Sequence, residues 1–379
     1  MNPNTPNRFE RHPVATWAGL VVAALVALEI GLRLFTPRMV RFAHDYRKTY
    51  RYHDEWYADL DPGTWTLLHL RNRRGHTIFN FLVTVGPHGF RTYDRRLDNN
   101  FRDVTGNNGK KVIHATGDSF CMGWGGSYVS SYPAQLDFML PREYRVINLG
   151  MNGYGAVGAL GKSRALSDRF PPAAVVYLAS SNDYMDDRNA ERYRRLPWAV
   201  HRLFDAFNVM RRHVYFASIP YALRWWLFYR GSLAATDDDF VEKKVQRRDN
   251  PADFTVVENA QPSDPSQGTV SKQTILDYSR YLSQRGIPFI VIGHGTDPGA
   301  NLDLCAFCRE QGIETYLLDV PGELRLAADG HFSHFGNYRL ALFVRSVLEK
   351  RGVVPVSPAT HVPDSSADTR DTLKNLSNS

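Results

Sequence analysis

A serine in a tight turn is the residue of this sequence with the clearest chemical potential. The segment Gly117-Asp118-Ser119-Phe120 directly follows a short apolar strand predicted over residues 111–116. Sites in parallel α/β sheets form at the carboxyl ends of strands, so a serine on this turn projects into the crevice. A serine hydroxyl is a poor nucleophile by itself. It needs a base whose tautomer is fixed by a third group.

A base and an acid of this kind occur together late in the chain. Asp329-Gly330-His331 lies in a loop between the last predicted strand and the last predicted helix. Loops that follow the first and last strands can meet at one edge of a sheet. We therefore expect Ser119, His331 and Asp329 to form a nucleophile, base and orienting acid.

Acyl transfer also needs hydrogen-bond donors directed at the developing oxyanion. Gly153 follows the second predicted strand, and its missing Cβ lets a backbone N–H approach a ligand closely. Asn182 follows the third strand and offers a side-chain amide. Each residue alone has a simple structural explanation as a turn glycine or a capping asparagine. Their order at successive strand ends favours a catalytic site.

The elements around these residues alternate between strands and helices. Continuous apolar strands separated by helices indicate a parallel sheet covered on both faces, that is, an α/β fold. The predicted strands are 111–116, 144–149, 173–179, 287–293 and 314–320, and the helices are 131–140, 156–169, 271–285, 301–312 and 336–351.

Four motifs in this order resemble the blocks of the SGNH (GDSL-like) hydrolase superfamily over about residues 111–352. They are GDSF, NxGxxG from Asn148 to Gly153, SSND from Ser180, and DGH. The resemblance implies a three-layer α/β/α flavodoxin-like domain and a serine esterase without metal or cofactor. Ser119 would be the nucleophile, and His331 the base oriented by Asp329. The N–H groups of Ser119 and Gly153 and the Asn182 amide would form the oxyanion hole.

The sequence departs from this family pattern in two blocks. The third block usually begins with glycine, and here Ser180 occupies that position. The last block is often D-x-x-H, whereas here it is D-x-H, so His334 competes with His331 for the role of base. Counting back from Gly336, the family's glycine after this block, favours His331.

The N-terminal region predicts a membrane anchor at residues 13–35, after a tail of residues 1–12. The anchor is almost wholly apolar and long enough to cross the roughly 30 Å hydrocarbon layer. Glu29 and Arg33 interrupt it four residues apart, a spacing that lets them pair. No small-x-small cleavage site follows, so we expect an uncleaved anchor rather than a signal peptide.

Three further segments flank or interrupt the predicted hydrolase domain. Residues 36–110 form a lead-in with strands at 64–70 and 77–85, and its segment from Gly86 to Arg91 resembles bacterial membrane-anchored family members associated with envelope polysaccharides. The insert at about 186–267 begins with aromatic-rich helices that fit an interfacial helix, a lid or a plain packing subdomain equally well. Residues 353–379 have the composition of a disordered tail.

The charge and the cysteine content indicate which classes of binding partner to expect. The net charge of +7 is concentrated near the anchor, where contact with anionic lipid headgroups explains it. Because no nucleic-acid-binding motif accompanies it, nucleic acid is not an expected partner. Cys305 and Cys308 lie in a predicted helix without a second Cys/His pair, so we interpret them as core-facing thiols.

The sequence therefore predicts a membrane-anchored serine esterase whose substrate is an acylated envelope polysaccharide or lipid. Two alternatives remain open: a glycan O-acetyltransferase that uses the same residues, and a catalytically inactive envelope scaffold. We expect the catalytic domain outside the cytoplasm, although the basic residues that follow the anchor outnumber Arg8 and Arg11 before it.

Overall fold

The structure is a computed structural model that describes residues 12–53, 55, 57–72, 74–75, 77–92, 109–234, 254–257, 264–294, 298–326 and 330–356. Several sequence-based predictions lie outside these residues. They are Asp329, the N-terminal tail up to residue 11, the loop at 99–108, most of the polar half of the insert, and the C-terminal tail from residue 357.

A mostly parallel central sheet carries the chain from strand to strand. Its five parallel strands follow the order β7-β6-β8-β10-β11, and a short antiparallel strand, β9 (Thr255–Val256), extends the edge beside β11. Numbered along the chain, the parallel strands have the order 2-1-3-4-5 of flavodoxin-like folds. The parallel strands are β6 (Lys111–Gly117), β7 (Tyr144–Asn148), β8 (Pro172–Ala179), β10 (Phe289–His294) and β11 (Glu314–Asp319).

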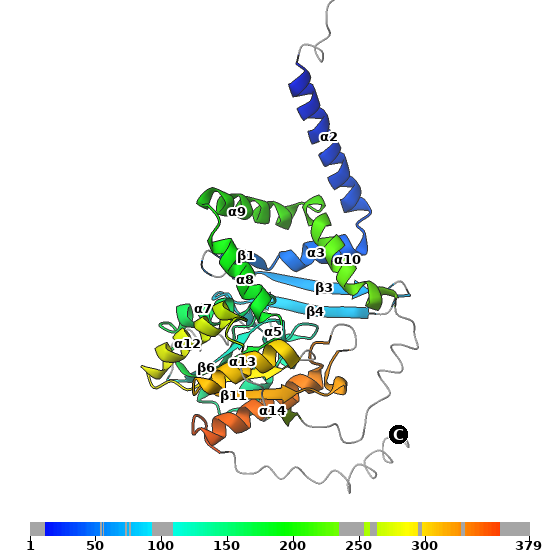
Figure 1. Ribbon diagram of the computed structural model, residues 1–379. Coiled ribbons are helices and arrows are strands. Elements are labelled where there is room, and N and C mark those ends of the chain that lie inside the picture. The colour runs from blue at the N-terminus through cyan, green and yellow to red at the C-terminus, as the bar shows by residue number, and fades with distance from the viewer. Residues whose placement is uncertain are drawn as a thin grey trace, which may run out of the picture.

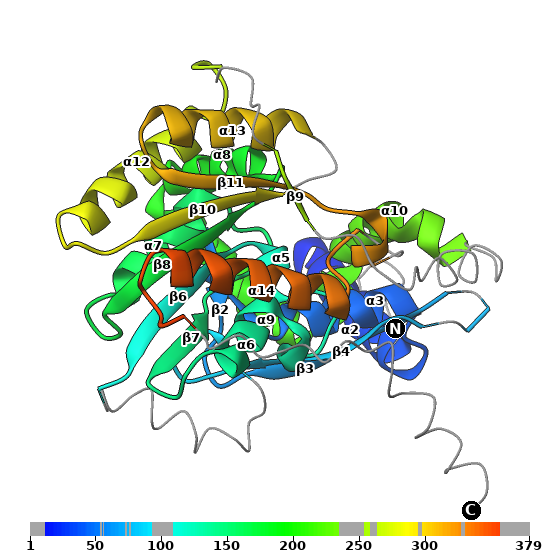
Figure 2. The same ribbon diagram turned by 90° about the horizontal axis from the view of Figure 1, so that it is seen from below.

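Helices cover both faces of this sheet, as the alternating pattern predicts (Figure 2). One face packs against α6 (Tyr132–Met139) and α14 (His334–Lys350), and the other against α7 (Ala156–Leu166), α12 (Thr269–Ser283) and α13 (Pro298–Glu310). The helix α8 (Asp183–Arg194) begins directly after β8. The three-layer flavodoxin-like fold is confirmed. Cys305 and Cys308 are fully buried free thiols in α13.

An isolated apolar helix, α2 (Pro13–Leu34), extends from the rest of the molecule (Figure 1). It has 22 residues, none of them buried, and a mean hydropathy of 2.0 over its most apolar window. At about 1.5 Å per residue it is long enough to span the hydrocarbon core of a bilayer. The predicted pair between Glu29 and Arg33 is present, with 2.8 Å between Oε1 and Nε.

The same two charged residues join α2 to the insert. Arg33 donates to the carbonyl of His213 at 2.7 Å, and Glu29 accepts from the backbone N–H of Phe216 at 3.2 Å. These contacts connect the last turns of α2 with the junction between two insert helices. The insert elements are α9 (Trp198–His213), the 3-10 helix η3 (Phe216–Ser218) and α10 (Ile219–Ala234).

The lead-in contains two small antiparallel sheets and one helix. The predicted strands at 64–70 and 77–85 are β3 (Trp65–Arg71) and β4 (Thr77–Val85), which pair with each other, and β4 also pairs with β5 (Arg91–Thr92). The second sheet pairs β1 (Tyr50–His53) with β2 (Tyr57–Leu60).

The lead-in helix, α3 (Arg38–Arg47), was not predicted, because its basic residues suggested a segment lying along lipid headgroups. Val40, Phe42 and Ala43 instead face the core, while Arg38 and Arg41 stay exposed. The helix is amphipathic, and its apolar side packs against β3 and α10. Only its exposed arginines remain available to a membrane surface.

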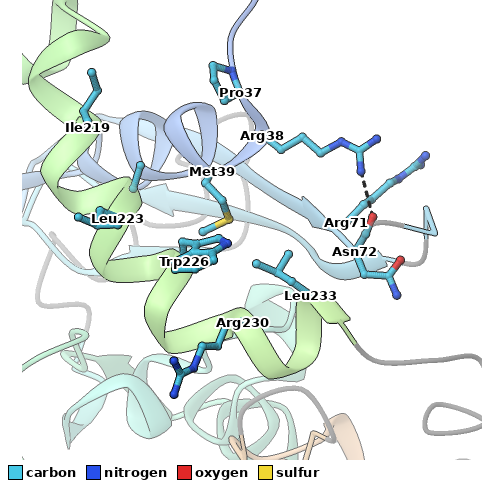
Figure 3. A pocket seen from close by; sticks show the side chains of 11 residues that line it. Pro37, Arg38, Met39, Arg71, Asn72, Ile219, Leu223, Trp226, Arg230 and Leu233 are labelled. Atoms are coloured by element: carbon cyan, nitrogen blue, oxygen red, sulfur yellow. Dashed lines mark hydrogen bonds between the residues drawn. The ribbon is translucent and has the colours of Figure 1, made fainter.

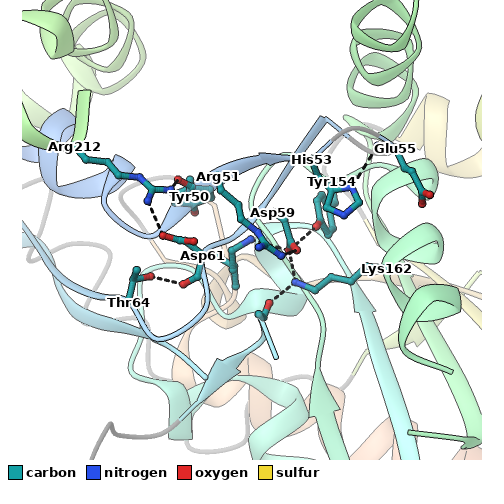
Figure 4. Close-up of polar contacts among 12 residues, drawn as sticks. Tyr50, Arg51, His53, Glu55, Asp59, Asp61, Thr64, Tyr154, Lys162 and Arg212 are labelled. Carbon is teal, nitrogen blue, oxygen red and sulfur yellow. Dashed lines mark hydrogen bonds and ion pairs between the residues drawn. The ribbon is translucent and has the colours of Figure 1, made fainter. Parts of the chain in front are cut away.

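A buried ion pair joins the lead-in to the hydrolase domain (Figure 4). Asp59 of β2 and Lys162 of α7 lie 2.5 Å apart and are both almost wholly buried. Tyr154 donates to the same carboxylate at 3.1 Å, and Arg51 pairs with it at 3.2 Å. Burial alone would raise the pKa of Asp59, but the Lys162 ammonium, the Arg51 guanidinium and the backbone N–H of Leu60 together lower it. Since breaking a buried pair costs several kcal/mol, roughly 3–5, this contact makes the two parts fold together.

Candidate active site

The nucleophile turn lies where β6 ends. Asp118 caps the short helix α5 (Ser119–Met122), because its Oδ1 accepts from the backbone N–H of Phe120 at 2.9 Å. The switch in strand order occurs between β6 and β8, and the crevice of such sheets opens at this point. Ser119 therefore sits at the usual position of a ligand site in this fold.

The structure brings Ser119 and His331 together, although 212 residues separate them in the chain. The distance between Ser119 Oγ and His331 Nε2 is 2.8 Å, a normal hydrogen bond. A short turn holds the histidine in place: the N–H of Leu326 donates to the carbonyl of His331, and Arg325 forms a β-bridge with Phe332.

The competing histidine lies elsewhere. His334 is the exposed first residue of α14, and within the described residues it makes no hydrogen bond to Ser119. The geometry therefore favours His331 as the partner of the serine. Asp329 lies outside the described residues, so its role as the orienting acid stays a prediction.

Two candidate donors for an oxyanion lie on the loops after β6 and β7. Gly153 has φ of +81°, a left-handed conformation that favours glycine, and a Cβ there would meet open space. In the part of the chain that the structure describes, no acceptor takes the backbone N–H of Ser119 or that of Gly153. Both donors remain available to a ligand.

The loop after β7 approaches the nucleophile helix very closely. A Cβ on Gly150 would lie 2.3 Å from the backbone nitrogen of Met122, so only glycine fits there. The N–H of Met151 donates to the carbonyl of Gly117 at 3.2 Å, and Asn148 donates to Met122 at 3.3 Å. These contacts fix the position of the Gly153 turn relative to Ser119.

The third candidate donor, Asn182, has a partner that the sequence did not indicate. Its Nδ2 donates to Oδ2 of Asp186, one turn later in α8, at 2.6 Å. A side-chain amide has two N–H groups, so one remains for a ligand while the other is held by the carboxylate. Burial raises the pKa of Asp186 to about 6, with the Asn182 hydrogen bond acting in the opposite direction.

Ser180, which replaces the family's glycine, forms part of a buried layer behind the site. Its Oγ lies 3.1 Å from Nε2 of His294, a wholly buried histidine whose pKa burial lowers well below the usual value. The ring of Phe120 separates the two histidines, with centroids 4.2 Å from His294 and 4.5 Å from His331. The substitution at Ser180 is therefore matched by a hydrogen-bond partner.

A fully buried arginine holds the loop after the nucleophile helix. Arg91, at the start of β5, donates to the carbonyls of Met122 at 2.7 Å, Gly123 at 2.8 Å and Gly126 at 2.6 Å. The resemblance of the Gly86 to Arg91 segment to anchored family members was the only sequence signal for this residue. Through these contacts an arginine from the lead-in holds the loop that follows Ser119.

Aromatic residues from three segments lie close to His331 or to one another beside it. Trp124 lies 6.4 Å from the His331 ring and stacks on Trp225 of α10 at 6.1 Å. Tyr46 of α3 contacts both tryptophans, at 5.5 and 5.1 Å, and its hydroxyl accepts from Asn152 at 2.8 Å. The lead-in and the insert thus contribute directly to the surroundings of the site.

The described residues contain no cluster of three or more side chains suited to a metal ion. No protein-family model matches the sequence, and no curated protein matches it.

Solved structures, in contrast, do resemble this chain. One is a member of the lipolytic protein G-D-S-L family from Veillonella parvula DSM 2008, with 12% identity over 64% of this chain and 99% of that chain, at a TM-score of 0.34. Another is the aryl esterase of M. smegmatis, with 13% identity over 63% and 99% and a TM-score of 0.33. A third is a carbohydrate acetylesterase family member from Sinorhizobium meliloti, with 12% identity over 63% and 98% and a TM-score of 0.30.

The raised pKa of Asp186 predicts how stability depends on pH. A folded-state pKa of about 6, above the usual 3.8, means that the fold favours the protonated carboxyl. Its contribution is complete below about pH 4 and is lost as the pH rises through about 6, at a cost of up to about 3 kcal/mol. Asp186→Asn keeps an acceptor for Asn182 and removes the charge. Its gain over the wild type in unfolding free energy should therefore grow between about pH 4 and about pH 6 and stay level above that.

This gain is measurable by denaturant unfolding of the full chain in detergent over that pH range. Asp168→Asn, at an exposed position, is the matched control. A difference between Asp186→Asn and the wild type that does not change with pH would contradict the assignment.

Proposed function

We propose that this chain is a membrane-anchored serine hydrolase of the SGNH type that cleaves acyl esters, with Ser119 as nucleophile. The observation that carries the proposal is the 2.8 Å contact between Ser119 Oγ and His331 Nε2 at the carboxyl edge of a flavodoxin-like sheet. Nucleophile and base within hydrogen-bond reach are the requirement for activating a serine.

The reaction follows from the positions of these groups. Ser119 Oγ attacks the ester carbonyl carbon while its proton passes to Nε2 of His331. The N–H groups of Ser119 and Gly153 and the amide of Asn182 stabilise the oxyanion of the tetrahedral intermediate. His331 then gives the proton to the departing alcohol, which leaves an acyl group on the serine. Water, activated by the same histidine, releases the acid, and Asp329 holds the imidazole in the required tautomer.

We assign the substrate to the acylated polysaccharides or lipids of the cell envelope. The support is the direct connection between the site and the proposed anchor. The helix α10 follows the segment that holds the end of α2, and its Trp225 stacks on Trp124 beside His331. An enzyme tied in this way meets substrates at a membrane surface. An acceptor other than water would make the same residues a transferase.

The two histidines can be separated by substitution. His331→Ala should lower kcat for a short aryl ester on the order of 10³-fold or more, as loss of a triad base does. His334→Ala should cost far less, because this side chain is exposed and away from the serine. Ser119→Ala, measured in parallel, should abolish turnover and leave the melting temperature nearly unchanged. A larger loss for His334→Ala than for His331→Ala would transfer the role of base to His334.

We further propose that the hydrolase domain lies outside the cytoplasm. Counting basic residues on either side of α2 favours the opposite orientation, but large folded domains translocate largely regardless of charge. The five basic residues after α2 belong partly to α3, and one of them, Arg51, pairs with Asp59. Arg51 is therefore used by the fold itself, whereas Arg38 and Arg41 stay exposed.

Reporter fusions after residue 352 measure this orientation in cells. Alkaline phosphatase should be active at that junction and green fluorescent protein dark, since each folds productively on only one side of the membrane. Bright green fluorescence with inactive phosphatase would place the domain in the cytoplasm.

A further inference from the structure

A cavity opens just beyond the end of α2 (Figure 3), and Ser119 is not among the residues that line it. Its volume is about 820 Å³, and it lies between the start of α3, the end of β3 and the outer side of α10. Most of its wall is apolar, and part of that wall is exposed to solvent. The apolar lining residues are Pro37, Met39, Ile219, Ala222, Leu223, Trp226 and Leu233.

Two arginines border one end of this cavity. Arg38 and Arg71 lie beside each other there, and Arg38 donates to the carbonyl of Asn72 at 2.9 Å (Figure 3). Within the described part of the chain neither arginine pairs with a carboxylate, and both are exposed. The cavity thus combines an apolar wall with the guanidinium groups of Arg38 and Arg71, which pair with no carboxylate among the described residues, and Arg230 lines it as a third arginine.

The distance of the cavity from the end of α2 sets its level relative to the lipid headgroups. Leu34 ends α2, and Arg38 follows four residues later. If α2 spans the hydrocarbon layer, Arg38 falls at the level of the headgroups. Arginines just beyond a span attract anionic lipids, each contributing on the order of 1 kcal/mol.

The insert helix α9 exposes large apolar side chains and buries polar ones. Its solvent-exposed side carries Trp198, Leu203 and Val209, which are 74%, 69% and 57% exposed, whereas Asn208 and Arg211 are buried. A helix that buries polar residues and exposes large apolar ones is suited to the membrane interface. The C-terminal end of α9 lies at the end of α2, because the His213 carbonyl accepts from Arg33.

We propose that the cavity binds an anionic phospholipid of the membrane that α2 crosses, with the phosphate at Arg38 and Arg71 and the first acyl carbons against Leu223 and Trp226. This inference rests on the proposed anchor, but not on the identity of the catalytic residues. The neighbouring residue of Trp226 in α10, Trp225, stacks on Trp124 near the site, so the helix that lines the cavity also contacts the catalytic region.

Native mass spectrometry of the full chain in detergent micelles tests the proposal. The protein is titrated with phosphatidylglycerol or phosphatidylcholine of matched acyl chains. The wild type should bind the anionic lipid roughly 30-fold more tightly, and Arg38→Gln/Arg71→Gln should lose that preference, as two contacts of about 1 kcal/mol each imply. The matched control is Arg142→Gln/Arg280→Gln, at exposed positions away from the cavity, and it should behave as the wild type.

Two further measurements test the acyl-chain contact and the phosphate contact separately. Leu223→Asn should weaken both lipids alike, because it alters only the apolar wall. Millimolar inorganic phosphate should fail to displace phosphatidylglycerol; displacement would show that the site recognises phosphate alone and would overturn the lipid assignment. An unchanged lipid preference in Arg38→Gln/Arg71→Gln would also overturn it. Aryl-ester turnover by each variant shows that it is folded, and it distinguishes failure here from failure of the proposed hydrolase.

Discussion

The burial of one guanidinium group, that of Arg91, constrains how this molecule can be assembled. It has no carboxylate partner among the described residues, and burial lowers its pKa to about 10, so it remains charged at neutral pH. Backbone carbonyls balance that charge: Leu82 from the lead-in sheet, and Met122, Gly123 and Gly126 from the loop after the nucleophile helix. A buried charge without such partners is very costly. The lead-in and the catalytic loop must therefore form together.

Other contacts connect α2, the insert and the lead-in with the residues around Ser119 and His331. Glu29 and Arg33 hold the end of α2 against the insert, and the insert places Trp225 on Trp124 beside His331. On the opposite flank, the buried pair of Asp59 and Lys162 ties the lead-in to α7. The loops around Ser119 and His331 are thus in contact with segments that a free-standing flavodoxin-like domain would not have. This arrangement gives the proposed anchor a structural connection to the chemistry.

The sequence predicted the parts of this molecule that follow from local patterns. The five parallel strands had continuous apolar runs, and they appear close to the predicted positions, whereas α8 and β9 were not predicted. The proximity of Ser119 and His331 followed from one topological rule about strand ends. The pairing of Glu29 with Arg33 followed from helical spacing alone.

Other features depend on contacts between segments far apart in the chain, which local patterns do not encode. The helix α3 was not predicted, because its arginines suggested a segment at the lipid headgroups. Its apolar side packs against β3 and α10, which are distant in sequence. Asp186 belongs to none of the four sequence motifs. It reaches the Asn182 amide because one turn of α8 brings the two side chains together. His294 meets Ser180 across 114 residues of sequence, so nothing near either residue predicted the pair.

The central claim is that Ser119 is an activated nucleophile, and covalent labelling tests it most directly. The full chain in detergent is treated with a fluorophosphonate, and the modified peptide is identified by mass spectrometry. We expect a single adduct on Ser119 that forms quickly in the folded wild type. No adduct should form when the protein is denatured before treatment, because activation of the serine needs the folded contact with His331. The absence of an adduct, or an adduct on another serine, would contradict it.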